Sequence, residues 1–510
     1  HGGCIHHDNG ILGARALPAA EWRKIRKLKE AGFNAIRTAH NPPSQALLEA
    51  CDHLGMLVLD EFFDCWRRGK NENDYHLWFE DWWRRDIDAT VRRDRNHPSV
   101  YCWSFGNEIE ETRGLADGQP LAAAQAAFIR ALDSTRLVTC GGMFLPKGQT
   151  CDGFPGGPGG PPSVDNVYVC PEEEHQRWAD IVDCLDIVSL NYSFRNYAQF
   201  AAIYPGKVLQ GTETQGIDAW GNRQAVRRNP HVIGDFMWTA QDNLGEAGAG
   251  RCYWEPQASQ GLLAGWPWLS CFQGDLALDG ERLPRSYYRK VIWGLDEGVH
   301  LFTTHPTHTG QTLYGTGFHW HDVQRRWTFE DQYMGQPVDV EAYADCDEVA
   351  FILNGREVVR VVPSEMIARA TLPYQPGTLT AIAYRAGRAA AQDAIETTGP
   401  ACRILLDAEQ SQLTADGMDL CYVSATLVDE AGRRVYGADI ELRATVTGPG
   451  TLAGFGSNNP CTEENFGTGR RMTWNGRAML ILRAGQEAGA LLVAVTTSSL
   501  PGAELDIPVR

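Results

Sequence analysis

The sequence predicts an α/β chain that begins with a (β/α)8 TIM barrel and ends with two all-β, immunoglobulin-like sandwich domains. Three observations support this prediction. Short apolar runs alternate with amphipathic helical patterns over roughly the first 295 residues. After about residue 300 the helical periodicity disappears, and apolar and polar residues alternate along short segments. The length of 510 residues also exceeds what one compact core accommodates.

The first part of the chain contains eight candidate strands, most of them continuous apolar runs. Strands of that kind are buried on both faces, as in a parallel sheet covered by helices. Eight such strands within roughly 250–300 residues match the size of a (β/α)8 barrel. The candidates span residues 2–7, 34–40, 56–63, 99–108, 136–142, 185–192, 207–213 and 232–242, and helices are predicted near 19–31, 43–54, 74–94 and 121–132.

The later part of the chain carries the signals of antiparallel sheets. Asn354-Gly355 lies between two alternating runs and predicts a tight hairpin. A boundary near 398–402, in a stretch with Gly and Pro, separates two regions of about 100 residues each, the size of a β-sandwich. The Pro/Gly run at 153–163 falls between the fifth and sixth strands and is predicted to be a loop. The predicted domains are 1–298, 299–398 and 399–510.

Composition excludes several classes of partner. The net charge of −18, without a basic patch, argues against a nucleic-acid partner, and no apolar run is long enough to span a membrane. The fourteen cysteines include no CxxC pair, and Cys102, Cys140 and Cys184 lie in or beside apolar runs. Buried reduced thiols are therefore expected, which favours a reducing, cytoplasmic compartment.

A carboxylate stands at the end of the fourth candidate strand. The apolar, aromatic run at 101–106 ends in Asn107 and Glu108, and Glu213 follows the apolar run of the seventh strand. In a (β/α)8 barrel the loops at the carboxyl ends of the strands converge on one mouth. We therefore expect Glu108 and Glu213 to point into the same mouth from different sides.

Two facing carboxylates suit the hydrolysis of a glycosidic bond. One of them, when protonated, donates to the leaving oxygen, and the other attacks the anomeric carbon or activates water there. A single glutamate at a strand end is more often the partner of an arginine or the cap of a helix. Two of them, at the fourth and seventh strands of one barrel, favour the catalytic interpretation.

Four longer motifs identify a family. NAIRTAHNPP, CDHLGMLVLDEFFDCW, DRNHPSVYCWSFGNEIEE and GTETQG closely resemble glycoside hydrolase family 2, which groups β-galactosidases, β-glucuronidases and β-mannosidases that retain the anomeric configuration. The resemblance is strong over residues 1 to about 295 and weaker over the β-domains. Family members carry a jelly-roll and a sandwich domain before the barrel. The resemblance therefore implies that these N-terminal domains belong to the full protein and are absent from this chain.

The resemblance also implies roles for single residues. Asn107-Glu108 matches the Asn-Glu pair of the family, which makes Glu108 the acid/base and Asn107 the partner of the sugar 2-hydroxyl. Glu213 matches the nucleophile. Arg37 and His40 match the motif of the second strand. Arg37 would hold a carboxylate ionised at low pKa, and His40 would contact sugar hydroxyls or the developing charge.

Two aromatic residues complete this set. Tyr192 would donate a hydrogen bond to Glu213, and Trp238 matches the aromatic floor under the sugar ring, where the apolar face of a sugar packs well. Electrostatics agrees with these roles, because a cation favours the ionised nucleophile. The negative charge of Glu213 favours a protonated Glu108 until Glu213 is glycosylated, after which Glu108 can act as the base.

Several other polar groups near strand ends carry weaker signals. His6 and Asp8 could converge on a metal ion, but a sugar contact at the end of the first strand, or packing, is the favoured interpretation. Asp242 and Glu246 follow Trp238 and are candidates for the rim of the sugar pocket. We expect no metal and no cofactor.

The carboxylates around the third and fourth strands allow alternatives. Asp60, Glu61 and Asp64 end the third strand and suit either ion pairs or contacts with substrate hydroxyls. Glu110 and Glu111 are predicted to form the solvated start of a helix, where the helix dipole stabilises acidic side chains.

The tryptophans are predicted to be mostly core residues. Trp66, Trp266 and Trp268 are the exceptions, because they lie in loops that we expect on the face of the barrel that holds the mouth. The tryptophans predicted to lie in the core are Trp78, Trp82, Trp83 and Trp103.

The identity of the sugar is the last question. The β-glucuronidases of the family carry an Asn-x-Lys element after the nucleophile, and the corresponding region here, 265–280, lacks it. A retaining exo-β-glycosidase that acts on a neutral sugar, β-galactoside first, is therefore expected, with a carbohydrate as its partner. A β-glucuronidase or other β-glycosidase of the family and an inactive carbohydrate-binding protein remain the alternatives, and assembly into a homo-oligomer stays open.

Overall fold

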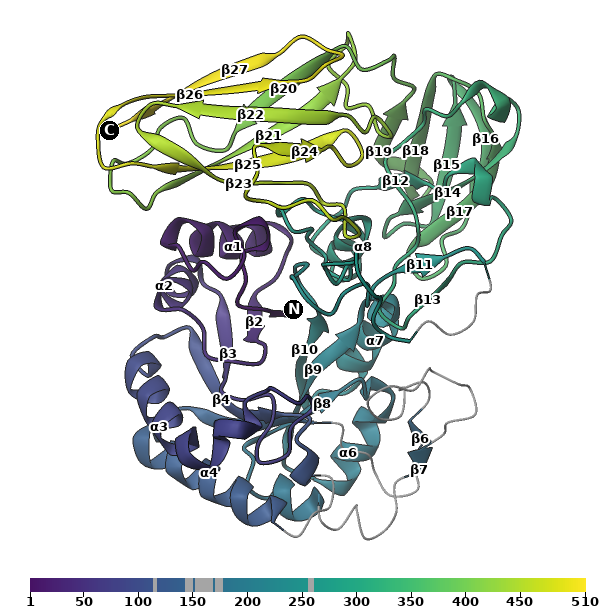
Figure 1. Ribbon diagram of the computed structural model, residues 1–510. Helices are drawn as coiled ribbons and strands as arrows, with labels where there is room; N and C mark the ends of the chain where they lie inside the picture. The colour runs from purple at the N-terminus through teal and green to yellow at the C-terminus, as the bar shows by residue number, and fades with distance from the viewer. Residues whose placement is uncertain (113–116, 143–149, 152–167, 170–177, 256–260) are drawn as a thin grey trace.

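The computed structural model describes residues 1–112, 117–142, 150–151, 168–169, 178–255 and 261–510. A closed barrel of eight strands is followed by further sheets that are all antiparallel (Figure 1), which confirms the predicted fold class. The Pro/Gly run at 153–163, predicted to be a loop, lies outside the described residues. Within the described ranges, no helix is both long and apolar enough to cross a membrane.

The barrel strands are the eight that the apolar runs predict, in the order β1-β10-β9-β8-β5-β4-β3-β2. Every neighbouring pair is parallel. Most of their residues are buried, because side chains on one face fill the barrel and those on the other meet the helices. The strands are β1 (Gly2–Ile5), β2 (Ala35–Thr38), β3 (Leu57–Glu61), β4 (Val100–Asn107), β5 (Leu137–Gly142), β8 (Ile187–Asn191), β9 (Val208–Gln215) and β10 (Val232–Trp238).

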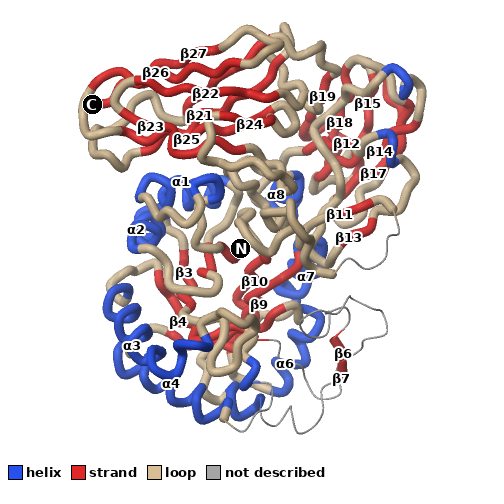
Figure 2. The backbone as a smooth tube through the Cα atoms, viewed as in Figure 1, coloured by secondary structure: helices blue, strands red, loops and turns tan. Residues whose placement is uncertain are grey.

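Helices surround these strands, as Figure 2 shows in blue around red. Local signals fix the ends of α2: Ser44 accepts a hydrogen bond from the Leu47 N–H, and Gly55 ends the helix in the left-handed conformation. The four predicted helices are confirmed, whereas α6, α7 and α8 were not predicted. The helices are α1 (Pro18–Glu30), α2 (Gln45–Leu54), α3 (His76–Asp94), α4 (Gly118–Leu132), α6 (Tyr197–Ile203), α7 (Ala219–Arg228) and α8 (Pro284–Ile292).

The middle part of the chain folds into two antiparallel sheets around one core. Apolar side chains from both sheets, such as Val340 and Phe351, meet in that core. Asn354 and Gly355 both have positive φ, of 51° and 80°, so the predicted hairpin forms between β15 and β16. The first sheet contains β12 (His300–Thr303), β14 (Pro337–Tyr343) and β17 (Ile367–Pro373); the second contains β16 (Arg356–Val361), β15 (Glu348–Leu353), β18 (Thr378–Arg385) and β19 (Arg388–Glu396).

The last part of the chain repeats this arrangement. Two antiparallel sheets enclose a core that includes Val423 and Val493. One sheet contains β20 (Arg403–Ala408), β21 (Leu420–Val428), β25 (Arg477–Ala484) and β23 (Gly450–Gly456). The other contains β24 (Arg470–Met472), β22 (Glu441–Thr447), β26 (Gly489–Thr496) and β27 (Ala503–Val509). Two small sheets pair β6 (Thr150–Cys151) with β7 (Tyr168–Val169) and β11 (Cys252–Tyr253) with β13 (Tyr314–Gly315).

Twelve cysteines of the described ranges are free. Cys102 and Cys140 are buried in the barrel strands, as predicted, and Cys184 is partly exposed. Burial raises the pKa of the Cys102 and Cys140 thiols, which keeps them protonated and unreactive. The compartment of the protein stays a prediction.

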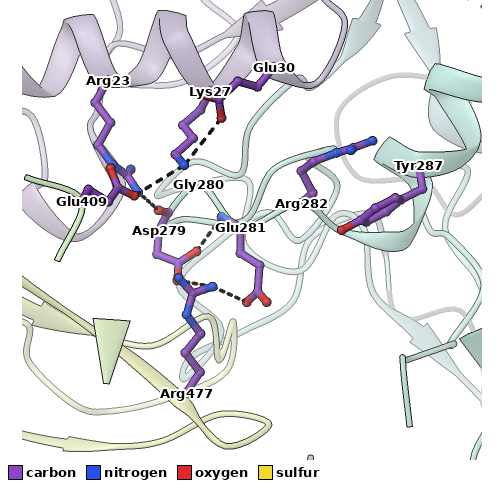
Figure 3. A pocket seen from close by; sticks show the side chains of 10 residues that line it. All are labelled: Arg23, Lys27, Glu30, Asp279, Gly280, Glu281, Arg282, Tyr287, Glu409 and Arg477. Carbon is purple, nitrogen blue, oxygen red and sulfur yellow. Dashed lines mark hydrogen bonds and ion pairs between the residues drawn. The ribbon is translucent and has the colours of Figure 1, made fainter. Parts of the chain in front are cut away.

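The last pair of sheets packs against the barrel beside α1 (Figure 1). An apolar contact joins Ile11 and Ala20 to Tyr422 and Ile481. Next to it, charged side chains of both parts line a cavity of about 200 Å³ (Figure 3). Arg23 of α1 donates to both Glu409 carboxylate oxygens at 2.8 and 2.7 Å. Apolar burial and a two-pronged ion pair therefore hold the two parts together.

Breaking this ion pair should loosen the interface. Arg23→Met keeps an unbranched side chain but removes both hydrogen bonds to Glu409 and the one to the Asp279 carbonyl. We expect the free energy of unfolding to fall by about 1–3 kcal/mol, because the pair is largely buried. Urea unfolding measures this change. As a control, Arg360→Met breaks the pair with Glu357 on an exposed strand and should leave the midpoint in place. Equal shifts in the two variants would contradict a special role for the interface.

Candidate active site

The two predicted catalytic carboxylates lie at the carboxyl ends of two strands of the barrel, β4 and β9, which are separated by β5 and β8. Glu108 directly follows β4, and Glu213 lies near the end of β9. The Glu108 N–H donates to the Gly141 carbonyl of β5 at 2.8 Å, and its φ of 47° turns the backbone away from the strand direction. A left-handed φ is costly for a residue with a Cβ, and such strain is common at functional sites.

Arg37 connects the carboxylates of this site. Its side chain is fully buried and donates to Glu213 Oε1 at 2.8 Å and to Glu61 Oε2 at 2.8 Å. It also donates to Asn107 Oδ1 at 2.8 Å. Gly141 makes room for the guanidinium, because a Cβ there would lie 2.7 Å from Arg37 Nη2. One cation thus holds two carboxylates and an amide in fixed positions.

Glu213 receives two hydrogen bonds, one on each oxygen. Arg37 donates to Oε1, and the Tyr192 hydroxyl donates to Oε2 at 2.5 Å, as predicted. Burial nevertheless raises the pKa of Glu213 to about 8, because it outweighs the lowering by Arg37, and the charge of Glu108 adds to the rise. The expectation that Arg37 would hold this carboxylate at low pKa is therefore wrong in its net direction.

Asn107 is held from both ends of its amide. Its Oδ1 accepts from Arg37 and from Asn191 Nδ2 at 3.0 Å. Its Nδ2 lies 3.2 Å from His40 Nε2 and donates to Asp64 Oδ1 at 3.1 Å. The amide therefore has a single orientation that satisfies every partner.

His40 is a neutral member of this network. Burial lowers the pKa of His40 well below its ordinary value. Its Nδ1 lies 2.6 Å from Glu61 Oε1, which fixes the proton on Nδ1 and leaves Nε2 to accept from Asn107. The imidazole also stacks on the Trp238 ring, with centroids 5.1 Å apart.

Trp238 lies at the end of β10 and is 5 % exposed. Its indole N–H donates to Glu246 Oε2 at 3.1 Å, and His6 packs edge-on against its ring at 5.2 Å. Glu246 also accepts from Gln273 Nε2 at 2.8 Å. His40 covers part of the face of Trp238 that was expected to support the sugar, so only the remaining surface is open to that role.

Two of the predicted binding residues are not part of this network. Asp242 is 5 % exposed and accepts from the Gly274 N–H at 2.7 Å, so it holds the chain after β10 in place. Asp8 accepts from the Gly10 and Leu244 N–H groups at 3.0 and 3.3 Å. Within the described part of the chain, neither carboxylate forms a hydrogen bond or ion pair with Glu108, Glu213 or Arg37.

Two further predictions near the strand ends need correction. Glu111 was expected at a solvated helix start, but it is fully buried and accepts from the Arg68 N–H at 2.9 Å. Glu110 is exposed, and a short 3-10 helix, Glu110–Thr112, replaces the expected helix. Asp60 is fully buried, and burial together with the neighbouring Asp94 carboxylate raises the pKa of Asp60 well above its ordinary value.

The tryptophans also divide differently from the prediction. Trp66, a candidate for the mouth, is fully buried and donates to the Phe105 carbonyl at 3.0 Å. Trp266 is 70 % exposed, as its loop position suggested. Trp78 and Trp82, expected in the core, lie on the exposed face of α3.

Sequence reasoning missed Asn191 and Lys70. Asn191 ends β8, and its Nδ2 donates to Glu108 Oε1 at 2.9 Å, so it positions the predicted acid/base. Lys70 lies between β3 and α3, and its Nζ donates to Asp64 Oδ1 at 2.6 Å. Asn191 could have been found from its place at a strand end beside Tyr192, whereas nothing in the polar stretch around Lys70 distinguishes that residue. The described residues contain no group of three or more His, Cys, Asp or Glu side chains that could hold a metal ion.

Sequence comparison agrees with this geometry. Residues 2–200 match the profile of the TIM barrel domain of glycosyl hydrolases family 2, and residues 404–506 match glycoside hydrolase family 2 C-terminal domain 5. The chain belongs to glycoside hydrolase family 2. Residues 335–391 of this family 2 chain match a domain of unknown function, DUF4982.

Individual relatives cover nearly the whole chain. The β-galactosidase BoGH2A of Bacteroides ovatus is 29 % identical over 99 % of this chain and 61 % of its own length. A solved family 2 member from Bacteroides cellulosilyticus is 35 % identical, with a TM-score of 0.87 over 100 % of this chain and 62 % of that one. A Formosa agariphila protein provisionally named a β-glucuronidase is 25 % identical over 84 % of this chain and 40 % of its own length. The chain thus spans about three fifths of the first two relatives.

Proposed function

We propose that this protein is a retaining exo-β-glycosidase that removes a terminal neutral sugar, β-galactoside first, by double displacement. The observation that carries the proposal is the pair Glu108 and Glu213 at one barrel mouth, joined through Arg37, Asn107 and Asn191. Two carboxylates are the groups that glycoside hydrolysis requires. A retaining mechanism further requires a separation of about 5–5.5 Å between them.

In the first step, Glu213 attacks the anomeric carbon while the bond to the leaving oxygen breaks. Glu108 gives its proton to that oxygen, so the aglycone leaves as an alcohol. Arg37 and Tyr192 hold the two Glu213 oxygens, which fixes the direction of attack. The result is a glycosyl ester on Glu213, without the negative charge that was there before.

In the second step, water replaces Glu213 on the anomeric carbon. Glu108, now ionised, takes a proton from this water, and Glu213 leaves as a carboxylate. Asn191, which donates to Glu108 Oε1 at 2.9 Å, supports the ionised form that acts as the base. Two inversions at one carbon give a product of the same anomeric configuration as the substrate.

A neutral sugar is favoured over a uronic acid by the charges at the mouth. Glu61, Glu108, Glu213 and Glu246 bring four carboxyl groups around Arg37 and Trp238. The name of the Bacteroides ovatus relative supports β-galactoside as the first substrate to test. The name of the Formosa agariphila relative keeps β-glucuronide as the second.

An inactive carbohydrate-binding protein is the alternative from a different class. It would have no use for a fully buried Arg37 that holds a 97 % buried Glu213, because burying charged groups is costly. This observation favours catalysis.

A panel of p-nitrophenyl β-glycosides tests the proposal. We expect release of nitrophenol to be fastest from the β-galactoside and slow from the β-glucuronide. NMR of the first product should show the β-anomer. A protein that releases nitrophenol from none of these substrates, or gives an α-configured first product, would not be a retaining β-glycosidase.

Tyr192 offers a test of the ionisation of the nucleophile. Glu213 attacks only when it is ionised, and its pKa is raised by burial, so kcat/KM should rise with pH above the range of an ordinary glutamate. Tyr192→Phe removes a hydrogen bond that lowers this pKa, so the acidic limb of the pH profile should move to higher pH. Tyr101→Phe removes another barrel hydroxyl, which donates to Gln210, and should leave the limb in place. If the acidic limb of Tyr192→Phe lies at the same pH as that of the wild type, the limb does not report the ionisation of Glu213.

A further inference from the structure

Asp64 and Lys70 form an ion pair on the loop between β3 and α3, beside the nucleophile. Asp64 Oδ1 accepts from Lys70 Nζ at 2.6 Å and from Asn107 Nδ2 at 3.1 Å. Lys70 Nζ also donates to the Asn107 carbonyl at 3.1 Å. His40 Nε2 lies 3.8 Å from Asp64 Oδ1 and 3.8 Å from Glu213 Oε1, so a single imidazole separates the pair from Glu213.

This pair has hydrogen-bonding capacity left for a ligand. Asp64 Oδ1 is occupied, whereas Oδ2 has no hydrogen-bond partner among the residues that the structure describes, and the side chain is 42 % exposed. Among the described residues, Lys70 Nζ donates to two acceptors and so uses two of its three N–H groups, and its side chain is 31 % exposed. The pair therefore offers a ligand one hydrogen-bond acceptor, Asp64 Oδ2, and one hydrogen-bond donor, Lys70 Nζ.

Such a pair discriminates between neutral and anionic sugars. A hydroxyl group can donate to Asp64 Oδ2 and accept from Lys70, so a neutral sugar satisfies both groups. A sugar carboxylate can only accept, so it leaves Asp64 Oδ2 unsatisfied and meets its negative charge. The charge of Lys70 is already paired with that of Asp64, at 2.6 Å. The same lysine without Asp64 would be a site for a carboxylate.

We propose that Asp64 sets the preference for a neutral sugar, by binding a hydroxyl together with Lys70 and by keeping Lys70 from binding a uronic acid. This inference rests on the proposed glycosidase function for its catalytic consequence. Its binding consequence can be measured separately.

The decisive variant is Asp64→Asn, which keeps the shape and removes the charge. We expect kcat/KM for p-nitrophenyl β-galactoside to fall about ten- to a hundredfold, because a charged hydrogen bond is lost. We expect kcat/KM for p-nitrophenyl β-glucuronide to rise about tenfold, as Lys70 becomes available. The double variant Asp64→Asn/Lys70→Met should lose this gain, because the cation is then absent.

Two measurements distinguish an effect of Asp64 itself from an effect of net charge or of lost turnover. Asp88→Asn removes an equal charge on the outer surface of α3 and should leave kcat/KM for both substrates unchanged. A rise in kcat/KM for the β-glucuronide in that variant would mean that net charge causes the effect, and would overturn the proposal. Calorimetric titration with galactose and with glucuronic acid gives the ratio of the two Kd values without turnover. A protein that binds galactose yet hydrolyses nothing would refute the proposed function, and the Kd ratio would still decide on Asp64. An Asp64→Asn ratio within twofold of the wild type, or binding of neither sugar, would overturn the inference.

Discussion

Glu213→Ala should abolish hydrolysis of every glycoside that the wild-type protein cleaves. Without the carboxylate no glycosyl ester can form, so the loss should exceed about 10⁴-fold, or roughly 5.4 kcal/mol of barrier. The loss should not depend on the leaving group, because a good leaving group does not replace the missing nucleophile. Initial rates with a nitrophenyl and a dinitrophenyl glycoside measure this.

Azide and a second variant make this test specific. Azide can enter the space that the Glu213 carboxylate leaves and attack from that side, so Glu213→Ala with azide should yield the α-glycosyl azide. Glu213→Gln keeps the shape and the hydrogen bond from Arg37, and should be as inactive as the alanine variant. A rescued product of β configuration, or a loss of less than about tenfold, would mean that Glu213 is not the nucleophile.

Glu108→Ala should behave differently, because it removes a proton donor and a base but leaves the nucleophile. Substrates with poor leaving groups should lose about 10²–10⁴-fold in kcat/KM, the usual contribution of a general acid. A dinitrophenyl glycoside needs little protonation, so its glycosylation step should survive. Deglycosylation, which lacks its base, should then limit the rate and give a burst of dinitrophenol.

Azide distinguishes this variant from Glu213→Ala. Azide needs no base, so it should speed up the turnover of Glu108→Ala and yield the β-glycosyl azide. The exposed neighbour Glu110 provides the control, since Glu110→Ala should keep wild-type rates. If azide gave the same anomer with both variants, or if Glu108→Ala slowed all leaving groups equally, the assignment of acid/base and nucleophile would be wrong.

The eight strands of the barrel could be predicted from the sequence, because strands of a parallel sheet appear as continuous apolar runs. Strands such as β4 are buried on both faces, so they appear as continuous apolar runs, and the polar residues that follow them mark the barrel mouth. Glu108 and Glu213 stand out for this reason. The helix α6 leaves no such pattern, because its seven residues span only about two turns.

Burial of single polar residues could not be predicted in the same way. Glu111 follows Glu110 in a polar stretch, and only the fold places it under the Arg68 backbone. Asp242 follows Trp238 at the end of the last barrel strand, where a pocket residue is expected, but its carboxylate accepts from the Gly274 N–H. Which side of a loop a side chain takes depends on what packs against that loop, and this is absent from the local sequence.

The sequence by itself determined the barrel and the antiparallel sheets behind it, because each rests on a local pattern of apolar, polar and turn residues, and it predicted the two candidate carboxylates from their places at strand ends. The tertiary structure decided how those carboxylates are held. Arg37 and Asn191 come from different parts of the chain and reach Glu213 and Glu108 only when the barrel closes. Lys70 meets Asp64 within one loop, and the fold then places this pair beside Asn107. The tertiary structure also decided the direction in which the pKa of Glu213 shifts. Burial depends on every neighbouring element, and it raises the pKa of this carboxyl more than Arg37 lowers it.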